Sequence, residues 1–163
     1  SKTGALIIFE RGVALNSIIS TGTVINADTT AELLKNMFFN KAPLHDGAVI
    51  IRDGRIAAAG CVLPLTQRTN LSKDLGMRHR AGIGLSEESD AVIIVVSEET
   101  GAISVAMDGM LKRHLSGEAL DKLLRSELTR EDDSTEKHSF MDTIRNFFKV
   151  NANVDEKQDE ENL

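Results

Sequence analysis

Residues 45–48, with the sequence His-Asp-Gly-Ala, place an imidazole and a carboxylate side by side just before an apolar run. Both groups are ordinary ligands of ions such as Mg²⁺ and Mn²⁺, and a carboxylate can also accept a proton. The adjacent Gly47 allows a turn at which the backbone approaches a ligand closely. A plain Asp-Gly turn is the competing interpretation of the same residues.

A second segment, Arg78, His79 and Arg80, encloses an imidazole between two guanidiniums. Guanidiniums fork onto phosphate oxygens, but neighbouring residues of a helix diverge by about 100°. We therefore expect one arginine on a phosphate and the other on an acid or a neighbouring subunit. Gly76 favours a helix N-terminus just ahead, where free N–H groups attract anions. The alternative is a solvated basic stretch on a helix surface.

A third segment, Ser97, Glu98 and Glu99, directly follows the most β-rich run of the chain. In open α/β sheets, ligands gather beyond the carboxyl ends of strands, so these side chains could meet a ribose, a base edge or a metal. A polar turn is the alternative. The chain has no Walker A lysine motif, no G-x-S-x-G and no dinucleotide-binding glycine fingerprint.

Composition sets the class of protein. The chain has 163 residues, of which 41% are hydrophobic and 27% charged, as expected for one soluble globular domain. A net charge of −6 and the absence of Trp and Tyr argue against a nucleic-acid partner. Cys61 is the only cysteine, which excludes a disulfide framework and indicates a buried structural thiol. The chain begins at Ser1 without a Met, so we expect a fragment of a longer protein.

The hydrophobic pattern predicts short strands and amphipathic helices. Asp53-Gly54 and Asp108-Gly109 each join two apolar runs, which is the strongest short signal for a hairpin. A helix is predicted to begin at a capping box in which Thr29 accepts the N–H of Glu32. Strands are expected over 5–9, 48–51, 56–65, 91–96, 102–107 and 110–115, helices over 29–38, 78–89, 116–128 and 139–150, a turn-rich stretch over 11–25, and a polar loop over 66–76.

These elements predict an α/β fold: a single domain with a mixed, twisted central β-sheet flanked by α-helices. The domain is expected to cover residues 1–128. Residues 129–150 read as a charged linker followed by a short amphipathic helix. Residues 151–163 carry five acidic side chains against one lysine, so we expect an acidic, disordered tail.

Taken in order, the chemistry-bearing segments resemble the bacterial diadenylate cyclase domain of the membrane-anchored type. The resemblance rests on Leu-His-Asp-Gly-Ala at 44–48, Leu-Gly-Met-Arg-His-Arg-Ala at 75–81 and Val-Val-Ser-Glu-Glu-Thr-Gly at 95–101. It extends from about Gly4 to about Leu128. It implies condensation of two ATP molecules into cyclic di-AMP with release of two pyrophosphates, in a homodimer whose subunits each hold one ATP.

The resemblance also implies residue roles. Asp46 would help to activate the attacking 3′-hydroxyl, Gly47 would let the backbone approach the nucleotide, and Leu63 would lie against adenine. Met77 stands where many family members have Thr, which loses or replaces one hydroxyl contact. The implied catalytic residues are Asp46, Gly47, Ala48, Arg78, His79 and Arg80; the ATP-binding residues are Leu63, Met77, Ser97 and Glu98; the metal ligands are His45 and Asp46.

The implied cofactor is a divalent metal, Mn²⁺ or Mg²⁺, with Co²⁺ as a further candidate. The implied partners are ATP, a second copy of the chain, a membrane regulator and a phosphoglucosamine mutase. The full-length protein would lie at the cytoplasmic face of the bacterial membrane, and this fragment would be soluble. Two rival functions remain: an ATP-binding regulatory module without turnover, and a metal-dependent phosphohydrolase that uses His45, Asp46 and Glu99.

Overall fold

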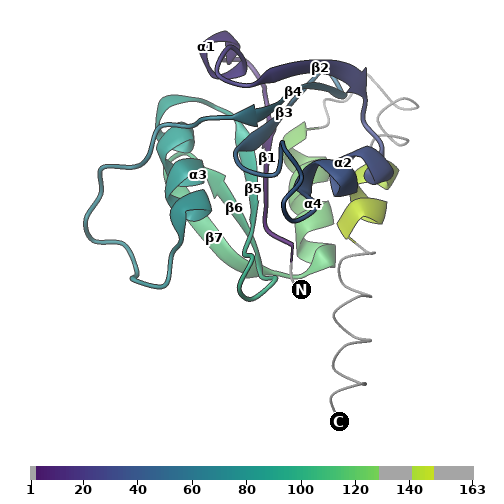
Figure 1. The fold of residues 1–163 in the computed structure, drawn as a ribbon. Helices are drawn as coiled ribbons and strands as arrows, with labels where there is room; N and C mark the ends of the chain where they lie inside the picture. The colour runs from purple at the N-terminus through teal and green to yellow at the C-terminus, as the bar shows by residue number, and fades with distance from the viewer. Residues whose placement is uncertain (1–2, 129–140, 149–163) are drawn as a thin grey trace.

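The structure, a computed structural model, describes residues 3–128 and 141–148. A mixed seven-stranded sheet in the order β2-β4-β3-β1-β5-β6-β7 forms its centre (Figure 1). The predicted fold class is confirmed. The strands are β1 Ala5–Phe9, β2 Thr23–Asp28, β3 Ala48–Arg52, β4 Arg55–Cys61, β5 Val92–Val96, β6 Ile103–Met107 and β7 Met110–Leu115; the helices are α1 Asn16–Ile19, α2 Ala31–Phe38, α3 Met77–Glu88 and α4 Gly117–Leu128.

β1 lies in the middle of the sheet and is buried along its whole length. It pairs parallel with β3 and antiparallel with β5. Its continuous apolar sequence fits a strand that is covered on both faces. Ala5, Ile7 and Phe9 point into one core cluster, whereas Leu6 and Ile8 point into the other, because side chains alternate along a strand.

Helices complete the two layers of core. α2, α4 and the helical residues 141–148 pack on one face through side chains that include Leu34, Leu124 and Phe147. On the other face lies α3, which contributes Leu85 (Figure 1). Within residues 3–128 and 141–148, no helix has the length and apolar character needed to cross a bilayer. Residues 139–140 and 149–150 of the predicted last helix lie outside the described residues.

Both Asp-Gly hairpins are confirmed, but three local predictions are wrong. The N-cap of α2 is Thr30, whose side chain accepts from the N–H of Leu33, while the Thr29 hydroxyl donates to the Gly54 carbonyl. The stretch 11–25 is not only turns, since it contains α1 and the start of β2. β4 ends at Cys61 instead of continuing to Leu65.

Segment 62–66 runs across α3 at very close range. The N–H of Thr66 donates to the Arg80 carbonyl at 3.1 Å, so the segment is bonded to the helix backbone. A Cβ on Gly84 would overlap the Pro64 carbonyl oxygen and would lie 2.8 Å from the nitrogen of Thr66. Only glycine at 84 lets the segment lie this close to α3.

Gly84→Ala is therefore expected to destabilise the fold by about 3 kcal/mol, because the obstructing atoms are backbone and cannot rotate away. Chemical denaturation monitored by circular dichroism measures this. The matched control is Gly117→Ala in α4, where an added Cβ meets nothing within 4 Å, and which should change stability by less than about 1 kcal/mol. Equal effects of the two substitutions would contradict the close contact.

Candidate active site

The strand registers bring two of the chemistry-bearing segments to the same edge of the sheet. Ile7 pairs with Val49 in β3, and Ala5 pairs with Val96 in β5. Continued by two residues, the parallel register sets Ala5 beside Gly47. Neighbouring strands lie about 4.8 Å apart. The residues before β3 and those after β5 therefore flank the start of β1.

The Asp-Gly turn before β3 requires glycine. Gly47 has φ +99°, and a Cβ there would lie 2.7 Å from the Cys61 carbonyl oxygen. The close approach of β4 therefore explains why position 47 needs glycine, without any role of a ligand. The side chain of Asp46 projects outward and is 87% exposed, so it is free to meet another molecule.

His45 and Asp46 form a pair suited to a cation. Nδ1 of His45 lies 2.7 Å from the Ala42 carbonyl oxygen, which can only accept, so Nδ1 carries the proton. In the neutral imidazole Nε2 then presents its lone pair, 3.4 Å from a carboxylate oxygen of Asp46. The described residues contain no cluster of three or more metal-ligating side chains. A metal held here would take its other ligands from phosphate and water, as Mg²⁺ commonly does.

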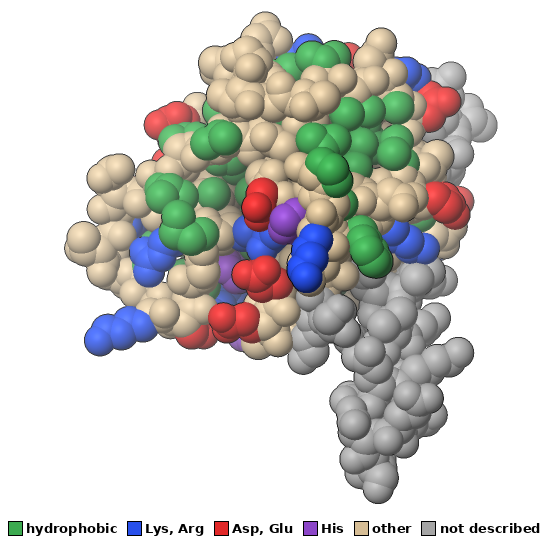
Figure 2. Space-filling model, in the orientation of Figure 1, with side chains coloured by type: hydrophobic (Ala, Val, Ile, Leu, Met, Phe, Trp, Pro, Cys, Tyr) green, Lys and Arg blue, Asp and Glu red, His purple; other side chains and the backbone are tan. Residues whose placement is uncertain are grey.

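A cavity of about 300 Å³ opens between the start of α3 and the turn after β5. Five predicted site residues line it: Met77, Arg78, His79, Ser97 and Glu98. Figure 2 shows acidic, basic and histidine side chains gathered near the centre of the face in view, with hydrophobic side chains around them. The list of implied site residues omitted six others that line the cavity, although the sequence had singled out the last two: Lys73, Asp74, Leu75, Val96, Gly76 and Glu99.

Arg78 lies across the start of β1. Its guanidinium pairs with Glu98 at 3.1 Å, and its Nε is buried without a hydrogen-bond partner. Gly4 forms the surface beneath this pair, because a Cβ there would lie 2.9 Å from Nη1 of Arg78. A buried N–H without a partner is costly, so an acceptor brought by a ligand would be favoured here.

His79 is 92% buried, and its Nδ1 has no hydrogen-bond partner. Burial lowers the pKa of His79 below the ordinary 6.5. The nearby positive charges of Arg113 and Arg78 lower it further, and Asp74 opposes them. His79 is thus a neutral imidazole at pH 7 that lines the cavity and has a buried ring nitrogen without a partner.

Arg80 does not share this cavity. Two positions along the helix from Arg78, it is rotated by about 200°, and its side chain has no ion pair or hydrogen bond within residues 3–128 and 141–148. Leu63 and Ala48 also lie elsewhere, since both side chains are buried in the core cluster under α3. The two arginines therefore point in different directions, as helix geometry predicts, but among the described residues it is Arg78 that pairs with an acid.

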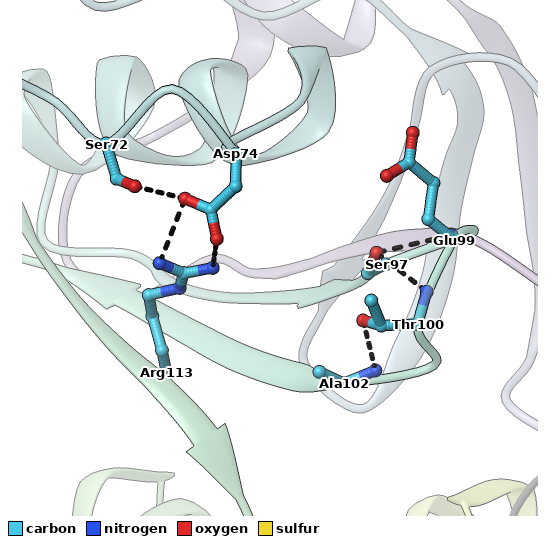
Figure 3. Close-up of polar contacts among 7 residues, drawn as sticks. All are labelled: Ser72, Asp74, Ser97, Glu99, Thr100, Ala102 and Arg113. Carbon is cyan, nitrogen blue, oxygen red and sulfur yellow. Dashed lines mark hydrogen bonds and ion pairs between the residues drawn. The ribbon is translucent and has the colours of Figure 1, made fainter.

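Ser97 organises the turn after β5, which forms the wall of the cavity opposite the start of α3. Its hydroxyl oxygen accepts from the N–H groups of Glu99 and Thr100, each at 3.3 Å, and the Thr100 hydroxyl accepts from Ala102 (Figure 3). The hydroxyl proton of Ser97 remains able to donate to a ligand. The carboxylate of Glu99 points away from this turn in the same view.

Comparison with known proteins decides the family. Residues 1–111 match the family DAC, described as the nucleotide-binding domain of the DisA bacterial checkpoint controller. The chain belongs to the DAC family. It is 48% identical to the cyclic di-AMP synthase CdaA of Bacillus subtilis over 129 residues, which are 79% of this chain and 47% of that protein.

Two further comparisons agree. The DAC chain is 54% identical over 110 residues to the diadenylate cyclase CdaS of Bacillus thuringiensis, covering 68% of this chain and 55% of that protein. It resembles the crystal structure of a double mutant of DacA from Staphylococcus aureus with a TM-score of 0.77 and 47% identity, over 78% of this chain and 85% of that one. The chain spans about half the length of the curated relatives it matches.

The buried state of His79 predicts a specific pH dependence. The unfolded chain takes up a proton near pH 6.5, whereas the folded chain resists it. The free energy of unfolding should therefore fall as pH falls below about 6.5, and level off once the folded form is protonated too. Denaturation curves of wild type and His79→Gln between pH 7.5 and about 5 measure this pH-dependent loss of the free energy of unfolding. The variant should lack the part that His79 contributes. Identical pH profiles would contradict the assignment.

Proposed function

We propose that this chain is a diadenylate cyclase domain, which joins two ATP molecules into cyclic di-AMP and releases two pyrophosphates. One observation carries the proposal. The start of β1 lies between the Asp46–Gly47 turn and the turn at Ser97, and the Arg78 guanidinium rests on Gly4 at that same point. An exposed acid and a guanidinium suited to phosphate thus share one edge of the sheet.

In the proposed reaction the triphosphate of one ATP occupies the cavity. Arg78 exchanges its exposed partner Glu98 for phosphate oxygens, and the N-terminus of α3 contributes its free N–H groups. The unused Nδ1 of His79 and the Ser97 hydroxyl hold further atoms of the nucleotide in place. Phosphoryl transfer depends mainly on such positioning and on neutralising the charge of the transition state.

Asp46 acts on the attacking group. The 3′-hydroxyl oxygen of one ATP forms a bond to the α-phosphorus of the other, its proton passes to the Asp46 carboxylate, and the bond from that phosphorus to the leaving pyrophosphate breaks. A second, equivalent step closes the ring. The exposure of Asp46 supports this role. No other side chain of the described residues covers its carboxylate, so a second nucleotide can reach it.

His45 and Asp46 would hold the divalent ion, Mn²⁺ or Mg²⁺, together with phosphate oxygens and water. When bound, the ion would withdraw charge from the phosphate oxygens and lower the pKa of the attacking hydroxyl. Two nucleotides must meet, and each chain presents one Asp46 turn. We therefore propose a homodimer in which two copies of this sheet edge face one another.

We place this domain at the cytoplasmic face of a bacterial membrane, in the membrane-anchored type that the sequence resembles. A membrane regulator and a phosphoglucosamine mutase are the expected partners of that type.

The proposal is tested by incubating the chain with ATP and Mn²⁺ and resolving the products by mass spectrometry. Cyclic di-AMP and two pyrophosphates per product are expected, with a specific activity that falls on dilution because two copies are needed. ATP binding without any product would support the regulatory module instead. Free phosphate or linear AMP, at a rate proportional to protein concentration, would support the phosphohydrolase.

Asp46→Asn should lower turnover by at least about a hundredfold, since the amide cannot accept the proton. It should leave stability unchanged, because the Asp46 side chain is 87% exposed. Asp28→Asn in β2 is the matched control, as its side chain is 86% exposed; it should turn over normally. Cyclic di-AMP production is the measurement. Wild-type turnover in Asp46→Asn would remove Asp46 from the chemistry.

A further inference from the structure

Loop 66–76 leads into the cavity and is tied at its end to a strand that does not line the cavity. Arg113 of β7 grips both oxygens of Asp74, with Nη2 at 2.6 Å from Oδ2 and Nη1 at 3.3 Å from Oδ1. The Ser72 hydroxyl donates to the same carboxylate (Figure 3). Such two-point contacts fix orientation as well as distance.

The beginning of the same loop is tied to the same hairpin. The Arg68 guanidinium donates to the Gly109 carbonyl in the β6–β7 turn and lies 3.5 Å from Glu87 of α3. The turn is itself fixed, because the Gly109 N–H donates to the buried Ser86 hydroxyl of α3 at 3.0 Å. The loop is therefore held at both ends by the β6–β7 hairpin, which is anchored on α3.

The Asp74 end of this attachment bears directly on the cavity. Asp74, Leu75 and Gly76 all line it, and Gly76 is the N-cap of α3. Leu75 is buried and follows Asp74 immediately, so a displacement of Asp74 is transmitted to the first turn of the helix. That turn presents both Arg78 and the free N–H groups.

We propose that Arg113 is a positioning residue: through Asp74 it holds the wall of the cavity in the conformation that receives a nucleotide triphosphate. This inference rests on the proposed function for the identity of the ligand. Arg113 also holds the pKa of Asp74 well below its usual range, with Ser72 adding to the effect, so the carboxyl is ionised at neutral pH.

The contact is suited to positioning more than to global stability. The side chain of Asp74 is 61% exposed and that of Arg113 is 32% exposed, and exposed ion pairs add little to the free energy of unfolding. Removal of the ion pair should therefore loosen the loop while the fold remains.

The charged groups around the neighbouring His79 come from three elements: Arg113 of β7, Asp74 of the loop and Arg78 of α3.

The test is a double-mutant cycle with Arg113→Gln, Asp74→Asn and the double variant. Affinity is measured by calorimetry with the non-hydrolysable analogue α,β-methylene-ATP and Mn²⁺. Each single variant should bind about fivefold more weakly, and the double variant no more weakly than either, because one contact is lost in each case. Lys112→Gln is the control: Lys112 is the exposed neighbour on β7 and has no ion pair within the described residues, so its variant should bind as wild type.

Hydrogen exchange gives a readout that does not depend on nucleotide. Amides of residues 72–77 should exchange faster in Arg113→Gln, and those of β5 should be unchanged. Unchanged exchange with wild-type affinity would overturn the proposal, as would effects that multiply in the double variant. A far larger loss in Asp74→Asn than in Arg113→Gln would also overturn it, because Asp74 would then contact the ligand directly. If wild type makes no cyclic di-AMP, the proposed function fails, while the exchange data still decide the role of Arg113.

Discussion

The pairing of β1 with β3 on one side and β5 on the other is the constraint on which the site depends. Because β1 is parallel to β3 and antiparallel to β5, the start of β3 and the end of β5 meet at the same edge. Burial on both faces fixes this register, since a slip by one residue would exchange the two core clusters. The Asp46 turn and the Ser97 turn are positioned by the core of the sheet.

α3 supplies the third side of the site, and small residues let it do so. Gly82 faces the sheet, where a Cβ would lie 3.0 Å from Val95, and Gly84 faces segment 62–66. The helix is thereby held between two layers, with its N-terminus at the cavity. A neutral histidine, a half-buried arginine and the N–H groups of the first helical turn gather there, beside the carboxylates of Asp74 and Glu98. These are the groups that we propose hold the triphosphate.

Much of the fold could be predicted from the sequence, because many of its elements are signalled by residues close together in the chain. The Asp53-Gly54 and Asp108-Gly109 turns and the run at β5 are signals that neighbouring residues carry by themselves. β2 was missed because it is an exposed edge strand whose alternation is interrupted by a register shift at Asn26, a residue with positive φ. Asp74 was missed because its partner Arg113 is 39 residues away, and Arg80 could be separated from Arg78 only by helix geometry.

If the Asp46 turn and the start of α3 share one triphosphate, as we propose, a single bound Mn²⁺·ATP lies close to both. Paramagnetic broadening of backbone amide signals by Mn²⁺·ATP measures this proximity directly. The amide signals of Gly47 and Arg78 should broaden together at low Mn²⁺·ATP, while the signal of Asp53, at the opposite end of β3, stays sharp. Broadening at only one of the two segments would contradict the proposal.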